Sequence, residues 1–415
     1  MNVLLHTFGC KANQYDTEVV RQRLEAAGCR VVATAAEADA AVVNSCVVTH
    51  VGEAKLRGFV RRLARARPGI RTVVMGCAAA VDDGRLAALP GVASVVRGAD
   101  DALVAEALGV RVGPSLPLRS FTGHGRAWLK VQDGCDEHCT FCATVLARGA
   151  NRSTGPEALV AQAALLAERH PEIVLTGVHI GSWGRDLDGG WTLGRLARLL
   201  VERVAEVRFR LSSVEATEVD DELLALMAGS PGRLAPHLHA PLQSGSDRVL
   251  RRMGRHWYTS ATYARRIEGI AARVAPFGLG ADVVVGFPGE TAADHAATVA
   301  LVRDLPFTYL HVFPYSAREG TAAPRLGAPS APEAVRERTA ELRAIAEARE
   351  AAHRSTRAGA LADLVIEGRR AGYHDAVTED YLAVRIPSDA PWVSGRRRVR
   401  GRLVARDGAL HAEAA

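Results

Sequence analysis

The sequence predicts an α/β protein in three parts: an open parallel α/β sheet, a partial TIM-like barrel of six βα units, and a small all-β domain. Two observations indicate this fold class. Short apolar runs alternate with amphipathic helical stretches over most of the chain, which is the pattern of parallel sheets. Beyond about Arg357 the period changes to short alternating strands. The expected parts are residues 1–115, 120–350 and 355–415.

The N-terminal part contains four apolar runs with helical stretches between them. Each run has the length of one strand, and a helix between two strands is the usual connection of a parallel pair. The expected strands are VLLHTF, AAVVNS, RTVVMG and VASVV, and the expected helices span about 16–27, 52–66 and 83–89.

The central part begins after a Gly/Pro/Ser-containing linker at about 109–125. Six strand candidates follow, with helical stretches such as 156–168 and 193–204 between them. Six βα units predict an incomplete barrel whose chemistry lies at the carboxyl ends of its strands. The candidates are AWLKVQ, EIVLTG, VRFRLSS, PHLHAPL, LGADVVVGF and TYLHVFPY.

A charged, alanine-rich helix over about 332–352 precedes the C-terminal part. The segments ADLVIE, AVTEDYLAVRI and RRRVRGRLVAR then alternate apolar and polar residues, as strands with one buried face do. This part is expected to form a small β barrel.

The composition is that of a globular protein, with 48% hydrophobic and 24% charged residues. No apolar stretch reaches the length of a membrane span, and the start MNVLLHTFGC does not have the form of a secretory signal, so we expect a cytoplasmic protein. The net charge of +6 suits a polyanionic partner such as RNA, although many metabolic enzymes are equally basic. Only three of the 52 basic residues are lysine, and this richness in arginine does not by itself indicate RNA binding.

Three of the seven cysteines form a compact motif, Cys135-x3-Cys139-x2-Cys142, directly after the first barrel strand. Three thiolates can hold three irons of a [4Fe–4S] cluster and leave the fourth iron open, as a bidentate cofactor such as S-adenosylmethionine (SAM) requires. Zinc is the alternative metal. A structural zinc site needs four ligands, and His138 between two of the cysteines is poorly placed to be the fourth.

Three further cysteines, Cys10, Cys46 and Cys77, each follow an apolar strand at its carboxyl end. These ends lie along one edge of an open α/β sheet, so the three thiols are expected to converge. The alternative is that they are unrelated buried cysteines. Cys29 follows neither pattern and is most simply a small buried apolar residue.

The motif ending in Phe141-Cys142 resembles that of the radical SAM superfamily, and the resemblance extends over nearly the whole chain. The N-terminal segments are similar to the three-cysteine domain of the methylthiotransferases, and the C-terminal domain resembles their RNA-binding TRAM domain. Within that family the chain is most similar to the subfamily that acts on N6-threonylcarbamoyladenosine, beside the tRNA anticodon. The segments that carry the likeness are TFGCKANQYDTE, VVNSCVVT, VMGC, VQDGCDEHCTFC, EIVLTGVHIG, HAPLQSGSDRVLRRM, DVVVGFPGET and HVFPYSAREGT.

The resemblance implies a radical enzyme with SAM and two [4Fe–4S] clusters as cofactors. The cluster of Cys135, Cys139 and Cys142 would reduce SAM to methionine and a 5′-deoxyadenosyl radical. A second cluster, held by the other three-cysteine set, would carry the sulfur that becomes methylated and reaches carbon 2 of the adenine. A radical is needed because that C–H bond is not acidic enough for a side-chain base. The implied partners are tRNA and a flavodoxin-like or ferredoxin-like electron donor.

Polar residues at other strand ends are candidates for SAM or substrate contacts. Ser212, Ser213 and Glu215 close the third barrel strand, where helix capping is the alternative. His239, Gln243 and Ser244 follow the fourth, where a structural histidine is the alternative.

Two more candidate groups lie near the SAM site that the resemblance implies. The segment Gly286, Phe287, Pro288, Gly289 and Glu290 follows a strand and is expected to shape the adenine pocket, with Gly286 and Gly289 at the cofactor; a tight structural turn is the alternative. Phe141, next to Cys142, is expected to be a further cofactor contact. Arg148 could meet a carboxylate or a phosphate, with an ordinary surface role as the alternative.

A basic run in the tail is the candidate for RNA contact. Arginines there would bind phosphates with salt-dependent affinity, and a solvated edge strand is the alternative. The residues are Arg396, Arg397, Arg398, Arg400 and Arg402.

The segment 143–147, Ala-Thr-Val-Leu-Ala, departs from the family pattern of bulky apolar residues and a proline, so substrate fit or rate could differ. Two other functions stay open. The same chemistry could act on isopentenyl-modified adenosine or on a ribosomal protein, or the chain could be a non-catalytic iron–sulfur RNA-binding protein.

Overall fold

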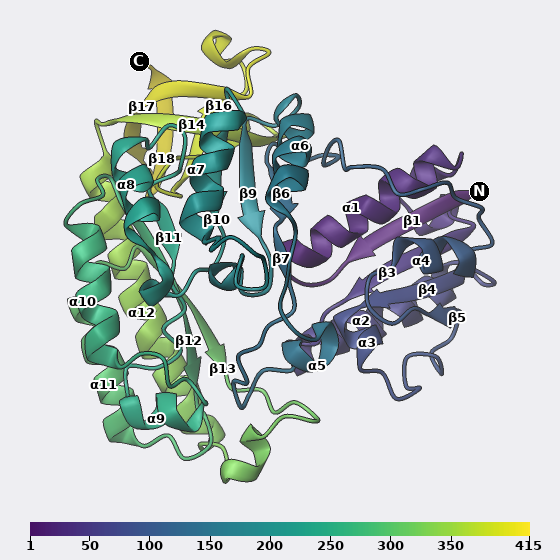
Figure 1. Ribbon diagram of the computed structural model, residues 1–415, viewed down its shortest axis with the longest axis horizontal. Helices are drawn as coiled ribbons and strands as arrows, with labels where there is room; N and C mark the ends of the chain where they lie inside the picture. The colour runs from purple at the N-terminus through teal and green to yellow at the C-terminus, as the bar shows by residue number, and fades with distance from the viewer. The chain divides into compact units, whose positions relative to one another are not determined.

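The computed structural model describes all 415 residues, which form two compact units (Figure 1). The first unit comprises Met1–Arg119, Gln132–Arg152 and Ser316–Ala322. The second unit comprises Ser120–Val131, Ser153–Tyr315 and Ala323–Ala415. The loop with Cys135, Cys139 and Cys142 therefore belongs to the same unit as the N-terminal sheet. The three-part division expected from the sequence stays a prediction.

The first unit is built on one fully parallel sheet, as the sequence predicts. The order of its strands places β1 and β4 on either side of β3, so the carboxyl ends of these three strands are neighbours. In order, the strands are β2 (Arg30–Val32), β1 (Asn2–Thr7), β3 (Ala40–Ser45), β4 (Arg71–Gly76) and β5 (Val92–Val95).

Helices cover both faces of this sheet and give the unit three layers. Helices α1 (Lys11–Ala26) and α4 (Asp101–Ala107) pack on one face, where Val20 and Val104 are buried against the strands. Helix α2 (His50–Ala66) packs on the other face. Burial of both sheet faces explains why the strands read as continuous apolar runs.

The helix expected over 83–89 is wrong: the segment folds as turns, and the only helix nearby is the short α3 (Cys77–Ala80). The carboxylate of Asp82 accepts the backbone N–H groups of Gly84 and Leu86. Hydrogen bonds from the backbone to a side chain compete with the backbone hydrogen bonds of a helix. The segment therefore forms turns although the spacing of its apolar residues suits a helix.

The second unit contains the six expected barrel strands. They form two three-stranded parallel sheets, and the bridges Phe209–Leu234 and Ser213–His239 join the sheets into one open series. The partial (βα)6 barrel is therefore confirmed. Its strands are β6 (Ala127–Lys130), β9 (Glu172–Thr176), β10 (Arg208–Leu211), β11 (His237–His239), β12 (Gly278–Val285) and β13 (Tyr309–Pro314).

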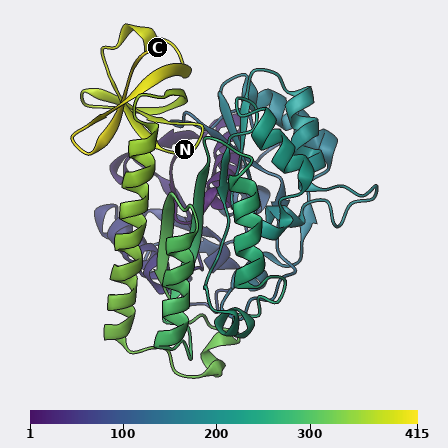
Figure 2. The same cartoon turned by 90° about the vertical axis from the view of Figure 1, so that its left-hand side faces the viewer.

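Helices line the outside of the barrel strands, and the 26-residue α12 leads into the C-terminal domain (Figure 2). Strands and helices alternate along this part of the chain, as they do in consecutive βα units. No helix in the structure is both long enough and apolar enough to cross a bilayer. The helices are α6 (Pro156–Ala167), α7 (Leu193–Arg203), α8 (Asp221–Gly229), α9 (Asp247–Arg252), α10 (Ser260–Ala271), α11 (Ala292–Asp304) and α12 (Pro332–Arg357).

The C-terminal segment forms a closed five-stranded barrel, as predicted. The expected strand AVTEDYLAVRI is in fact two strands, because a turn at 378–382 with Tyr381 at φ +74° reverses the chain. The last strand was not predicted. In barrel order the strands are β14 (Leu361–Arg370), β15 (Tyr373–Val377), β16 (Ala383–Pro387), β18 (Ala409–Ala414) and β17 (Arg398–Arg406).

A buried charge network holds the two barrels of the second unit together. The carboxylate of Glu172 is fully buried and accepts from Nε of Arg208 at 2.5 Å and Nε of Arg210 at 2.8 Å. The other guanidinium nitrogens of these arginines donate to the carbonyls of Asp363 and Thr378 in the C-terminal barrel. Burial alone would raise the pKa of Glu172, but the arginine charges outweigh it and hold this pKa well below its usual range.

Candidate functional site

The first unit contains all seven cysteines, and none of them forms a disulfide bond. Cys29 is packed in the core of the unit beside Val3 and Leu24, which agrees with a purely apolar role. The other six lie in loops or at helix starts, outside the strands. They are Cys10 before α1, Cys46 after β3, Cys77 after β4, and Cys135, Cys139 and Cys142 between β7 (Gln132–Asp133) and α5 (Thr144–Arg148).

Cys10, Cys46 and Cys77 converge at the carboxyl edge of the sheet, as their positions in the sequence predict. Oδ1 of Asn13 lies 3.4 Å from Sγ of Cys10 and 3.8 Å from Sγ of Cys77. Cys46 is within electrostatic range of Cys10 and of Cys77. The three thiols therefore form one cluster, which we call the sheet-edge triad.

Backbone geometry allows the chain to turn sharply at this edge. Gly76, directly before Cys77, has φ +93°, a conformation that favours glycine. A Cβ atom there would meet the Asn44 side chain and would lie 2.7 Å from the carbonyl oxygen of Ser45. The close backbone packing at Gly76 therefore places Cys77 beside the other two thiols of the triad.

The thiols of both cysteine groups receive backbone N–H groups from two residues further along the chain. The N–H groups of Val48 and Glu137 point to Sγ of Cys46 and Cys135, at 3.5 and 3.4 Å. The same pattern joins Thr144 to Cys142 at 3.4 Å. Such N–H···S contacts stabilise thiolates that bind a metal, and three thiols in each group fit the demands of a [4Fe–4S] cluster with one open iron.

Arg148, on α5, lies between the two cysteine groups, and its side chain is only 7% exposed. Nε lies 3.1 Å from Sγ of Cys77, and Nη1 donates to both carboxylate oxygens of Asp133 at 3.0 Å. Nη2 donates to Asn13 at 3.1 Å and to Asp16 at 2.9 Å. Arg148 therefore meets two carboxylates, as considered from the sequence, and its alternative role as a surface residue is wrong.

Burial and charge act in opposite directions on these groups. Burial raises the pKa of the Cys77 thiol to about 11, although the charge of Arg148 opposes this, and burial also raises the pKa of Cys46. Burial disfavours the charge of Arg148, but Asp16, Cys77 and Asp133 more than compensate and raise its pKa. The guanidinium therefore stays charged beside a thiol that needs a cation, or a metal, to ionise.

A cavity of about 500 Å³ opens beside both cysteine groups. Val47, Ala78 and Ala143 line it, and each directly follows a cysteine. Arg318 forms an ion pair with Glu53 in its wall. Ala143 also packs with Val47 and Cys77, so the unusual 143–147 segment forms part of the packing between the two groups.

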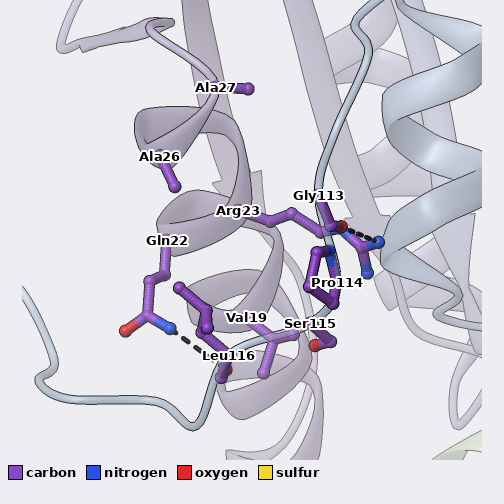
Figure 3. Close-up of a pocket in the computed structure, with 9 residues that line it drawn as sticks. All are labelled: Val19, Gln22, Arg23, Ala26, Ala27, Gly113, Pro114, Ser115 and Leu116. Atoms are coloured by element: carbon purple, nitrogen blue, oxygen red, sulfur yellow. Dashed lines mark hydrogen bonds between the residues drawn. The ribbon is translucent and has the colours of Figure 1, made fainter.

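A smaller pocket of about 170 Å³ lies elsewhere in the first unit, between α1 and the segment 113–116 (Figure 3). Gln22 donates to the carbonyls of Leu116 and Pro117, and Arg23 donates to Gly113 at 2.7 Å. These bonds fasten the linker to α1. None of the candidate site residues lines this pocket.

In the second unit, His239 is part of a polar group on three adjacent barrel strands. Oδ1 of Asp282 lies 3.1 Å from Nε2 of His239 and 3.3 Å from Nδ1 of His311. The hydroxyl of Tyr309 lies 3.1 Å from the other ring nitrogen of His239. Burial alone would raise the pKa of Asp282, but the hydrogen bonds from the two histidines outweigh it and lower this pKa. The group can bind polar ligand atoms, and its donor set could also hold a metal ion.

The other strand-end candidates have defined structural partners. Glu215 is buried and pairs with Arg255 at 2.5 Å. Ser213 is exposed beside His239, and Ser212 is half-buried. Ser244 lies 3.4 Å from Oγ1 of Thr298, and Gln243 adopts φ +62°. Contacts of these residues with a cofactor stay predictions.

The segment after β12 is a tight turn. Gly286 has φ +78° and donates its N–H to Oε2 of Glu290 at 2.7 Å, while Phe287 is fully buried against Tyr315. Gly289 has φ +79°. The segment is therefore a tight structural turn, as the alternative stated, and adenine binding by this turn stays a prediction. Phe141 is half-buried in the first unit.

The basic run of the tail lies at and before β17. Arg398 forms an ion pair with Asp363 and donates to the carbonyl of Gly232 at 2.7 Å. Its guanidinium therefore already has partners within the second unit. The edge-strand alternative is wrong, because β17 pairs with β14 on one side and β18 on the other. The remaining four arginines are exposed: Arg396, Arg397, Arg400 and Arg402. Among them, Arg402 donates Nη1 to the carbonyl of Gly359 at 2.8 Å.

Several residues of the site escaped the sequence analysis. Asn13, Asp16 and Asp133 lie within segments that carry the family resemblance, but no role was predicted for them, and only the fold brings them to Arg148. Asp282 and His311 had a usable signal, because each is a polar residue within an otherwise apolar strand.

Two family profiles match the chain. The profile described as "Uncharacterized protein family UPF0004" matches residues 2–98, and that of the "Radical SAM superfamily" matches residues 129–302. The first covers the sheet-edge triad, and the second covers the Cys135–Cys142 motif and most of the barrel.

Curated relatives are similar over most of the chain. The threonylcarbamoyladenosine tRNA methylthiotransferase MtaB of Bacillus subtilis is 38% identical over 343 residues, covering 78% of this chain and 75% of the relative. The enzyme of the same name from Thermotoga maritima is 35% identical, covering 78% and 77%. The tRNA-2-methylthio-N(6)-dimethylallyladenosine synthase of a Parafrankia species is 33% identical, covering 88% and 78%.

Among solved structures, the radical SAM methyltransferase TsrM of Kitasatospora setae superimposes with a TM-score of 0.58. The match covers 78% of this chain and 73% of that protein at 14% identity, and it supports the fold alone.

Proposed function

Because this chain belongs to the radical SAM methylthiotransferase family, we propose that it methylthiolates carbon 2 of N6-threonylcarbamoyladenosine beside the anticodon of tRNA. The single observation that carries the reaction type is the presence of two three-cysteine groups in one unit, linked by Arg148. An enzyme that only cleaves SAM needs one such group, whereas transfer of sulfur requires a second.

The residues fit two [4Fe–4S] clusters. Cys135, Cys139 and Cys142 would hold the cluster that binds SAM, and the sheet-edge triad would hold the other. When bound, these clusters supply the electron for SAM cleavage and the iron that carries the transferred sulfur. Asn13 contacts two of the triad sulfurs and fixes their orientation. A flavodoxin-like or ferredoxin-like protein is the proposed electron donor.

The substrate proposal rests on similarity and on the surface of the C-terminal barrel. The curated relatives with the highest identity reported above act, by their names, on threonylcarbamoyladenosine in tRNA. The exposed arginines before and on β17 offer phosphate contacts, as a polyanionic substrate requires. An anticodon loop can present its base unstacked, which makes carbon 2 accessible.

A direct test is an anaerobic assay with the reconstituted protein, SAM, dithionite and two purified tRNAs. One tRNA carries threonylcarbamoyladenosine, and the other carries isopentenyladenosine. We expect the methylthio product on the first tRNA only. Product on the second alone would transfer the proposal to the isopentenyl substrate. SAM cleavage without product on either tRNA would direct attention to ribosomal proteins, and absence of SAM cleavage would favour the non-catalytic alternative.

A further inference from the structure

Arg148 has more polar partners than a structural ion pair requires. Its three nitrogens contact a thiol, an amide and two carboxylates. The partners come from three separate segments: Asn13 and Asp16 on α1, Cys77 at the start of α3, and Asp133 on β7. The first two segments belong to the sheet-edge triad, and the third immediately precedes the Cys135 motif.

We propose that Arg148 is a positioning residue that fixes the loop of the SAM-binding cluster to the sheet-edge triad and tunes the triad's cluster through a hydrogen bond to Cys77. This inference rests on the proposed function only in assigning clusters to the two groups. It adds a role for a residue that is not itself a ligand.

The geometry supports the fixing role. A guanidinium presents its donors in a rigid planar fork, so contacts along several directions determine its position. The bidentate bond to Asp133 acts two residues before Cys135, and Arg148 itself follows Cys142 by six residues. Both ends of the cluster loop are thereby tied to one cation. Asp16, only 3% exposed, holds the same cation from the side of the triad.

Chemistry supports the tuning role. Hydrogen bonds to cluster sulfurs and nearby positive charge favour the reduced state of an iron–sulfur cluster, because reduction adds negative charge. Nε of Arg148 lies 3.1 Å from Sγ of Cys77, and the side chain is shielded from water. Its charge is therefore little screened. The thiols of Cys135 and Cys142 instead accept from the backbone N–H groups of Glu137 and Thr144.

The test uses full-length protein in two backgrounds, each with one cluster only. Replacing Cys135, Cys139 and Cys142 by Ser leaves the triad's cluster, and replacing the triad by Ser leaves the other. In each background we compare the parent with R148Q after reconstitution, and determine iron content and the midpoint potential by EPR-monitored titration. R152Q is the matched control, because Arg152 follows Arg148 by only four residues, at the start of β8 (Arg152–Ser153), is exposed and donates only to carbonyls.

The proposal predicts that R148Q makes the potential of the triad's cluster more negative while its iron content stays near that of the parent. The other cluster should shift less, and R152Q should shift neither. Equal shifts in both backgrounds, or no shift in the triad's cluster, would overturn the tuning role. If R148Q fails to assemble clusters, R148K retains the charge without the fork and should show a smaller negative shift.

A second readout addresses the fixing role in the protein with both clusters. R148K should increase the amount of 5′-deoxyadenosine formed per methylthio product, because the loops are no longer held in register. An unchanged ratio would contradict this role. A parent that makes no methylthio product would instead refute the proposed function, and the potential measurements would still stand.

Discussion

Nε of Arg148 lies 3.1 Å from Sγ of Cys77, although 71 residues separate them in the chain. This contact brings the end of the Cys135–Cys142 loop to the sheet-edge triad within one compact unit. Two cysteine groups that are far apart in the sequence are thereby parts of one site. The predictions below test that site, the scaffold that supports it and the surface that would bind RNA.

Removal of one triad thiol should remove one cluster. In C77S, we expect the reconstituted protein to keep about four of about eight irons per chain, since each [4Fe–4S] cluster needs all three of its thiolates. Iron and acid-labile sulfide analysis measures this. C29S is the control, because Cys29 lies in the core away from both groups, and it should retain all irons. Full iron content in C77S would exclude Cys77 as a ligand.

The turn before Cys77 should tolerate no side chain. In G76A, the added Cβ would clash with Asn44 and Ser45, and the residue would have φ +93°. Backbone strain of this kind costs about 1–3 kcal/mol. Because the clash adds to the strain, we expect a larger loss in the free energy of unfolding. G84A is the matched control, because Gly84 has φ +102° with nothing within 4 Å of the added atom. Urea unfolding should show G76A clearly less stable than G84A. Equal stability would mean that the packing at Gly76 is not tight.

The buried charge of Glu172 should stabilise the second unit. E172Q removes the buried carboxylate that Arg208 and Arg210 share and leaves Arg210 without a counter-charge, whereas Arg208 keeps Asp363. We expect a loss of about 3–5 kcal/mol in the free energy of unfolding. E157Q removes an exposed pair with Arg203 and should cost no more than about 1 kcal/mol. Urea unfolding at pH 7 compares the two variants.

The ionisation of Glu172 makes the stability of the protein depend on pH. The folded-state pKa of Glu172 lies below its unfolded value near 4.5, so its contribution is complete above that pH and declines as pH falls below it. The difference in stability between the wild type and E172Q should therefore be constant from about pH 6 to 8 and shrink below about pH 4.5. A difference that grows on acidification would contradict this assignment.

The exposed tail arginines should contribute phosphate contacts. Replacing Arg396, Arg397, Arg400 and Arg402 by Gln should weaken tRNA binding and flatten the dependence of log affinity on log salt by roughly 0.7–0.9 per lost contact. A matched control replaces four exposed arginines on and directly after α2 by Gln: Arg61, Arg62, Arg65 and Arg67. Filter binding at several salt concentrations distinguishes them. Equal losses in both variants would indicate only a general effect of charge.

The sequence predicted the architecture because apolar period and strand length are local signals. All six barrel strands and the N-terminal parallel sheet are confirmed. Local signals failed where side chains capped the backbone, as Asp82 does in the turn that replaces the expected helix. They also failed at Tyr381, where a left-handed residue divides an apparently continuous strand.

The cysteine groups were predictable because each cysteine follows a strand or belongs to a compact motif. Arg148 was only one candidate among many arginines, because nothing in the sequence brings Asp16 and Asp133 to the same side chain. Contacts between residues so far apart depend on how the sheet and the cluster loop pack, which no short-range pattern records.

Mass spectrometry of tRNA nucleosides, from cells with and without the gene, tests the central claim most directly. The account predicts that 2-methylthio-N6-threonylcarbamoyladenosine disappears in the deletion strain while N6-threonylcarbamoyladenosine accumulates. The wild-type gene should restore the product, and the C77S variant should not. An unchanged nucleoside profile in the deletion strain would contradict the account.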